Sequence, residues 1–185
     1  MFCLWSVLII CMVSVMKLIK ATKENGLFHE LETQWRGQFS EYDEDFDDYQ
    51  SSYREHTKQV LEGSYTNYHV YILENKGAYE AFAHVNHAQI KKLPGHTLRV
   101  TEVFLAPRYE YENTSEDTIS ILSSALYAET IRLSRDVYPS ETSKLYMRGL
   151  NHTVLSAFAR FFSGQFGLEV VQQGAWLVTT KISAS

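Results

Sequence analysis

Apolar and polar residues alternate over several short stretches of the chain, the pattern of half-buried β-strands. We expect strands over residues 16–21, 68–73, 79–90, 97–106, 144–148, 168–171 and 175–182. Between the second and third of these stretches stands Glu74-Asn75-Lys76-Gly77, which predicts a hairpin turn in which Gly77 supplies a positive φ. A second turn at Pro94-Gly95 would make residues 68–106 a three-stranded antiparallel meander.

Between these stretches, apolar residues recur every three or four positions, which indicates amphipathic helices. We expect Thr22 to cap a helix that runs to about Gln34, and Ser40 to cap a second that ends near Gly63. The second helix carries an aromatic stripe under an acidic face, with the aromatic side chains at Tyr42, Phe46, Tyr49 and Tyr53. A third helix is expected from Thr114 or Ser115 to about Val137, with its inward positions at Ile119, Leu122, Leu126 and Leu133. A fourth is expected from Asn151 to about Phe162.

This order of elements predicts one α/β domain over residues 16–185. A meander followed by a strand, helix, strand crossover gives a mixed sheet with helices on both faces. At this length a single core can bury about two-thirds of the unfolded surface.

Composition narrows the classes of partner and chemistry. The net charge is −5 with no run of Lys and Arg, so we expect no nucleic-acid partner. The only cysteines, Cys3 and Cys11, lie in the first fifteen residues. The rest of the chain therefore has no thiolate nucleophile and no cysteine metal ligand, and a reducing compartment is compatible with it.

Residues 1–15 are apolar and carry no charged side chain, and Lys17, Lys20 and Lys23 follow. Three interpretations stay open: a start codon assigned too early, with Met16 opening the folded domain, a short membrane anchor, or an uncleaved signal. Translation from Met16 would give a cytoplasmic protein, and the longer form would be membrane-anchored. A membrane partner is expected only in that second case.

Three segments carry a resemblance to a known family. Residues 98–109, LRVTEVFLAPRY, resemble the fourth strand of the Gcn5-related N-acetyltransferases (GNATs), which runs into a proline and an aromatic residue. Residues 145–151, LYMRGLN, resemble the fifth strand, and residues 161–169, FFSGQFGLE, resemble the aromatic helix end and the strand after it. Together with the order of elements, the resemblance covers residues 16–182.

The resemblance implies an acyl-CoA N-acyltransferase fold and the transfer of an acetyl or acyl group from acetyl-CoA to an amine, without a metal. It implies that strands four and five splay apart, with Val103, Phe104 and Leu105 holding the thioester and the pantetheine arm. The phosphates would meet the loop and helix that follow. The residues implied there are Arg108, Asn113, Thr114 and Ser115, with Asn151 from the fifth strand's end. Glu102 would be the general base, and Tyr146 or Tyr109 would stand in for the family's tyrosine acid, because the matching positions are Phe161 and Phe162.

The expected phosphate loop departs from the family pattern. No glycine stands between Tyr109 and Ile119, so side chains crowd the backbone that a phosphate would approach. The segment instead carries four carboxylates, at Glu110, Glu112, Glu116 and Asp117. Negative charge in the first turn of a helix satisfies the helix dipole and repels pyrophosphate. A second hypothesis is therefore a GNAT-like binding or regulatory module that has lost coenzyme binding.

Several candidate residues have a plainer interpretation. Glu102 alternates with Thr101 and Val103 and is expected to face solvent unless it is the base. Asn151 is a common helix cap. His84 and His87 stand three apart on a strand and point to opposite faces, so they should not share an ion.

The resemblance implies an amine acceptor on a small molecule or a protein. The acidic stretch at 41–48 is either a solvated face or the border of a cleft for a cationic acceptor. A homodimer is also compatible with the sequence.

Overall fold

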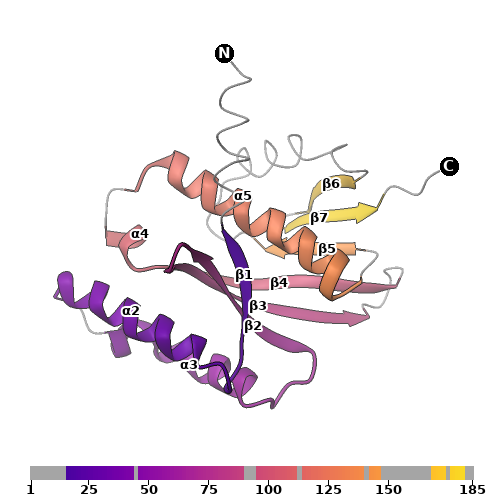
Figure 1. Ribbon diagram of the computed structural model, residues 1–185. Coiled ribbons are helices and arrows are strands. Elements are labelled where there is room, and N and C mark those ends of the chain that lie inside the picture. Colours follow the sequence, from indigo (N-terminus) through magenta and orange to yellow (C-terminus); the bar gives the residue numbers. More distant parts are fainter. Residues whose placement is uncertain are drawn as a thin grey trace. The chain divides into compact units, whose positions relative to one another are not determined.

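The computed structural model describes residues 16–43, 46–89, 95–111, 114–139, 142–146, 168–173 and 176–181 (Figure 1). The chain forms two compact units, described separately below. The first combines residues 1–84 with 104–129, and the second combines residues 85–103 with 130–185. The strands are β1 (Lys17–Ala21), β2 (Tyr68–Asn75), β3 (Ala78–Gln89), β4 (His96–Leu105), β5 (Thr142–Tyr146), β6 (Leu168–Gln173) and β7 (Trp176–Lys181). The helices are α2 (Leu27–Glu41), α3 (Phe46–Leu61), α4 (Arg108–Tyr111) and α5 (Glu116–Arg132), with a π-helical turn η1 (Leu133–Val137).

In the first unit, β1, β2 and β3 form consecutive neighbours in the sheet. Strand β1 is antiparallel to β2, with Lys17 opposite Glu74 and Ala21 opposite Val70. Lys76 (φ 52°) and Gly77 (φ 86°) connect β2 to β3 and both have positive φ, the pattern of a type I′ turn. The hairpin predicted from Gly77 is confirmed.

Helix α2 begins later than predicted. Gly26, with φ 66°, occupies its N-cap position, and the first helical residue is Leu27. Thr22 instead belongs to a turn before the helix, where the backbone N–H of Asn25 donates to the Thr22 hydroxyl and the Asn25 side-chain oxygen accepts from the N–H of Thr22 and of Leu27. Thr22 as the cap was therefore wrong, because Asn25 holds the intervening residues in a turn.

The boundary between α2 and α3 also differs from the prediction. Helix α2 continues to Glu41, past the predicted end at Gln34, and α3 starts at Phe46 instead of at Ser40. The chain reverses at Asp43, which has φ 56°, a left-handed conformation that Asp tolerates better than most residues. The acidic stretch 41–48 thus runs from the last residue of α2 into the first turn of α3, instead of forming one face of a single helix.

The core of the first unit forms where α2 and α3 cover β1 to β3. Phe28 meets the ring of Phe82 edge-on at 5.3 Å, and Trp35 lies 5.6 Å from Phe82. Val70 and Ile72 of β2 belong to this cluster, and the alternate residues Tyr71 and Leu73 are also buried. Because neighbouring strand residues point to opposite faces, both faces of β2 are covered.

In the second unit the strands follow the order β3-β4-β5-β7-β6. Strand β4 pairs with β5 in parallel, whereas β5 with β7 and β6 with β7 are antiparallel. The parallel pair confirms the predicted crossover, and β6 with β7 confirms the terminal strand pair. The sheet is therefore mixed, as predicted.

The segment after β4 contains two helices where one was predicted. The short helix α4 precedes α5, whose start is capped by Ser115, because its hydroxyl accepts from the N–H of Thr118 (3.2 Å). The long helix ends in η1 at Val137, the predicted position. The predicted helix at 151–162 lies outside the described residues. None of the helices described combines the length and the apolar character needed to span a membrane.

Candidate functional site

The residues predicted to hold a thioester lie together at the end of β4. Val103, Phe104 and Leu105 are the last three residues of this strand, and all are partly buried. Glu102 is exposed, as its solvent-facing interpretation expects. Because side chains alternate along a strand, Glu102 and Phe104 project from the same face of β4.

Strands β4 and β5 form a parallel ladder. It joins Thr97 with Thr142 and continues to Val100 with Leu145. Strand β4 runs five residues further, to Leu105, whereas the described part of β5 ends at Tyr146. Val103 and Leu105 lie on β4 past Val100, and residues 147–167 lie outside the described part of the chain.

A histidine cluster that the sequence analysis did not assign packs against the end of β4 in the first unit. The His84 ring is fully buried on β3, and its Nε2 lies 2.8 Å from the Thr57 hydroxyl of α3. The centroids of the His56 and His84 rings lie 4.8 Å apart, and those of the Phe104 and His84 rings lie 5.9 Å apart. Phe104 in turn stacks on Phe82 at 4.6 Å. A histidine inside an apolar strand was the available sequence signal, but its partners are far away in sequence.

His56 is the accessible member of this cluster. It is half-buried, and two tyrosine rings stand at its edge, Tyr65 at 5.6 Å and Tyr68 at 6.0 Å. Imidazole is the side chain that exchanges protons most readily near neutral pH. His56 is therefore the member of this cluster that a molecule in solvent can reach.

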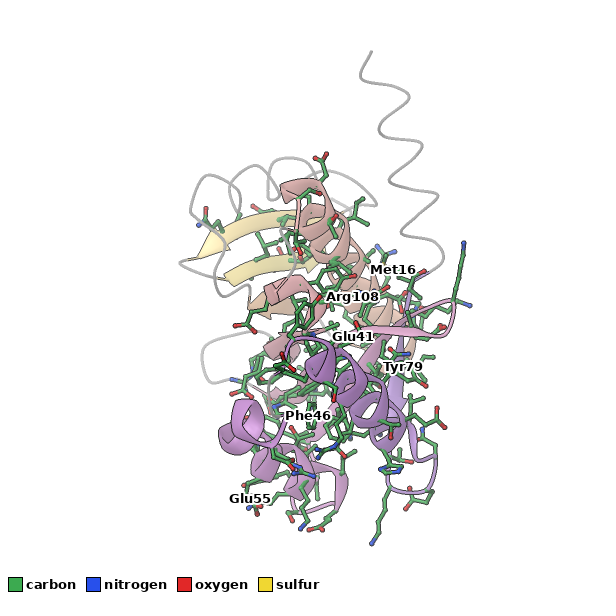
Figure 2. All side chains as sticks on the ribbon, turned by 90° about the vertical axis from the view of Figure 1, so that its left-hand side faces the viewer. Met16, Glu41, Phe46, Glu55, Tyr79 and Arg108 are labelled. Atoms are coloured by element: carbon green, nitrogen blue, oxygen red, sulfur yellow. The ribbon has the colours of Figure 1, made fainter. Side chains whose placement is uncertain are left out.

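A second cluster joins β3 to the segment after β4. Glu80 is only 3% exposed and forms an ion pair with Arg108, the first residue of α4. The same carboxylate oxygen accepts from the Tyr109 hydroxyl (2.6 Å), and the other accepts from the Asn75 amide (3.0 Å). The backbone N–H of Arg108 donates to Gln38 of α2 (3.2 Å), and Figure 2 shows Arg108 beside the end of that helix, near Glu41.

These contacts fix the protonation of Arg108 and Tyr109. Burial raises the pKa of the Tyr109 hydroxyl to about 12, and the hydrogen bond to Glu80 adds to this effect. Burial opposes the charge of Arg108, but its hydrogen bond to Tyr109 and the charge of Glu80 outweigh this, so its pKa is raised. Tyr109 holds its proton too tightly to be an effective acid, and the Arg108 guanidinium is engaged with Glu80.

The remaining predicted site residues are only partly described. The Thr114 hydroxyl donates to the carbonyl of Tyr109 (3.3 Å), and the exposed Ser115 caps α5. Tyr146 ends β5 opposite Trp176, and its side chain lies outside the described residues, as do Asn113 and Asn151.

A solved structure identifies the fold of this chain. An N-acetyltransferase from Campylobacter jejuni, PseH, aligns with 92% of this chain and 99% of its own at 12% identity, with a TM-score of 0.50. The chain has the Gcn5-related N-acetyltransferase fold. An aminoglycoside N(6′)-acetyltransferase from Legionella pneumophila aligns with 90% of this chain and 91% of its own (12% identity, TM-score 0.47). An acetyltransferase from Thermus thermophilus aligns with 89% of this chain and 96% of its own (13% identity, TM-score 0.44). No family model and no curated protein matches the sequence.

Within the GNAT fold, the predicted thioester positions stand at the end of β4, and Phe104, one of them, packs on the histidine cluster of the first unit. The segment that follows β4 is helical from Arg108 to Tyr111 and is tied to Glu80. In this GNAT-fold chain, the one basic residue from Arg108 to Asp117 is thus committed to a carboxylate.

Proposed function

We propose that the chain is an N-acyltransferase that moves an acyl group from an acyl-coenzyme A to an amine. The observation that carries the proposal is the run of β4 through Val103 to Leu105 in a chain with the GNAT fold, because these are the positions expected to face the coenzyme. A pantetheine arm carries amide groups that can pair with strand backbone. The GNAT fold and the N-acetyltransferase activity named for PseH support the same reaction.

In the proposed reaction, the neutral amine attacks the thioester carbonyl to form a C–N bond. The tetrahedral intermediate then collapses, the C–S bond breaks, and the coenzyme thiolate leaves and takes up the proton that the attacking nitrogen gives up as the amide forms. The ammonium form of the acceptor must first lose a proton to a base. Glu102 is the proposed base through water, and His56 is the alternative, because carboxylate and imidazole side chains both serve as general bases.

A cationic amine is the proposed class of acceptor. Glu41 and Asp43 are exposed carboxylates at the end of α2, and Phe46 and Asp47 begin α3 directly after this connection. Asp47 is paired with Arg36 (2.7 Å) and Arg54 (2.6 Å), so it contributes less to attraction than the other two. A polyamine and a lysine-containing peptide are suitable probes.

To test the reaction, the full chain is incubated with acetyl-CoA and each of these amines, and the coenzyme A that is released is measured with a thiol reagent. Glu102→Gln should lower kcat at least about 100-fold with little change in the KM for acetyl-CoA, because general base catalysis is typically worth this much. Glu62→Gln, another exposed carboxylate, is the matched control and should keep full activity. An unchanged kcat in Glu102→Gln together with a similar loss in His56→Gln would transfer the role to His56.

A binding module without coenzyme chemistry is the second candidate, because Arg108 is committed to Glu80 and no glycine opens the loop after it. Ser115→Asp separates the two candidates, since Asp also caps helices well but adds a negative charge where phosphate would bind. If coenzyme A binds at the start of α5, this variant should bind about tenfold more weakly. Ser120→Asp, exposed further along α5, should bind normally.

A further inference from the structure

A cavity of about 560 Å³ opens between the first turns of α2 and the last turns of α3 in the first unit. Its volume falls within the range of small-molecule sites. The cavity is separate from the end of β4, because α2 meets the segment after β4 at Gln38, nine residues or roughly 13 Å beyond His29 of the lining. Figure 2 likewise shows Glu55, another lining residue, well away from Arg108.

The most buried side chains of the lining are apolar. Phe28 is only 8% exposed and belongs to the core cluster of the first unit, and Leu61 is partly buried and packs against the same cluster. An apolar group that covers these two side chains leaves water for an apolar surface, which is favourable. The cavity therefore suits a ligand that has an apolar part.

Glu32 is the one charged residue of the lining that is not exposed, and its side chain is 16% exposed. Its ion-pair partner is Arg54, whose Nε lies 3.3 Å away. The same guanidinium approaches Asp47 more closely, at 2.6 Å, so its charge is shared between two carboxylates. A carboxylate withdrawn from water is costly unless opposite charge compensates for the lost hydration. An ammonium group in the cavity would complete the compensation of Glu32.

Two lysines line the cavity further from Glu32. Lys23 belongs to the turn before α2 and Lys58 to α3, and both are exposed. Among the residues that the structure describes, neither lysine forms a salt bridge. Lys58 follows Arg54, the partner of Glu32, by four residues, or roughly 6 Å along the axis of α3. The cavity thus presents a carboxylate at one point and ammonium groups about one helical turn away.

We propose that this cavity binds a small zwitterion with an apolar side chain, such as an apolar amino acid or dipeptide. The ammonium group of the ligand pairs with Glu32, and its carboxylate pairs with Lys23 and Lys58. Its side chain covers Phe28 and Leu61. A ligand with only one of the two charges would be attracted at one end of the cavity and repelled at the other. The proposal does not depend on the proposed acyl transfer.

Calorimetric titration of the full chain with L-phenylalanine and with glycyl-L-phenylalanine tests the proposal. One equivalent of at least one of them should bind, and the tighter of the two identifies the source of the zwitterion. Phenethylamine lacks the carboxylate, and 3-phenylpropionate lacks the ammonium group. Each should bind at least about tenfold more weakly than the zwitterion, because each loses a charged hydrogen bond.

Two variants test the assigned contacts. Glu32→Gln keeps the shape of the side chain and removes its charge, so it should weaken binding at least about tenfold. Lys58→Gln, at an exposed position, should weaken binding about threefold, the scale of an exposed ion pair. Glu169→Gln and Lys20→Gln are the matched controls, since both residues are exposed and neither lines the cavity. Both controls should bind as the unaltered chain does.

Three outcomes would overturn the site. These are no heat with either zwitterion at millimolar concentration, equal binding of phenethylamine or 3-phenylpropionate, and unchanged affinity in Glu32→Gln. Circular dichroism of each variant shows whether it is folded. If Glu32→Gln unfolds, the comparison of Lys58→Gln with Lys20→Gln decides the question, and equal affinities in these two would overturn the site.

Discussion

Glu80 lies almost fully buried on β3, and both of its carboxylate oxygens accept hydrogen bonds. A buried carboxylate is costly unless a cation and hydrogen bonds compensate for the lost water, and Arg108, Tyr109 and Asn75 provide both. The same pair holds the beginning of α4 against β3. Arg108 is thus a structural residue in this chain, even if phosphate binding also depends on the segment that it anchors.

Replacing Glu80 by Gln should destabilise the protein. The change leaves the guanidinium of Arg108 without its charged partner, at a cost of about 3 kcal/mol, the low end for a buried pair because Arg108 is 30% exposed. Urea unfolding followed by circular dichroism measures the difference. Glu62→Gln, on the surface, should unfold at the same urea concentration as the unaltered chain, and an equal midpoint for Glu80→Gln would show that the ion pair contributes little.

Tyr109 predicts a specific alkaline transition. Its pKa is raised to about 12 from the usual value near 10, so the folded state holds this proton more tightly than the unfolded state. The stability that the proton contributes is fully present below pH 10 and is lost as pH rises from 10 toward 12. The difference in absorbance at the tyrosinate band between the unaltered chain and Tyr109→Phe should show a midpoint near pH 12. A midpoint near pH 10 would mean that the hydroxyl is neither buried nor bonded to Glu80 in solution.

At the scale of elements, two glycines should respond oppositely to the same substitution. Gly77 has φ 86° in the β2–β3 turn, and a methyl group there would meet no atom within 4 Å, so Gly77→Ala costs only the left-handed conformation, roughly 1 kcal/mol. Gly37 lies inside α2, also with open space around it, and Gly37→Ala should stabilise by roughly 0.5 to 1 kcal/mol through helix propensity. Thermal unfolding of both variants is the measurement. Shifts of the melting temperature with the same sign would contradict the conformations assigned to these positions.

Local sequence was sufficient to predict the strands, the β2–β3 hairpin and the crossover, because alternation and turn residues are short-range signals. It misplaced the break between α2 and α3. Phe39 and Phe46 pack together at 5.6 Å and are seven residues apart, which is also a helical spacing, so the pattern continues across a turn made by Asp43. The short helix α4 was missed because its anchor, Glu80, is 28 residues away from Arg108.

The candidate site shows the same limit. The end of β4 could be predicted, since residues 98–109 resemble a known strand. The cluster of His56, Thr57 and His84 could not, because it joins α3 to β3 across 27 residues between its bonded members. Arg108 was expected to meet phosphate from its place in the sequence alone, and only the structure shows its pairing with Glu80.

At the scale of the whole molecule, the fold and the loop after β4 favour different functions. The GNAT fold extends over most of the chain, and β4 runs through Val103 to Leu105, the positions expected to meet a coenzyme arm. The segment from Arg108 to Asp117 is acidic, lacks glycine and has its one basic residue engaged. Both observations are reconciled if the strand supplies most of the binding and the loop supplies little.

Calorimetric titration of the full chain with acetyl-CoA tests this account most directly. Binding along β4 predicts one equivalent of acetyl-CoA with a dissociation constant in the micromolar range. Raising the salt concentration from about 0.05 M to about 0.2 M should weaken this binding less than it would weaken binding at a phosphate-dominated site, because few cations contact the phosphates. The absence of both heat and a thermal shift at millimolar acetyl-CoA would contradict it.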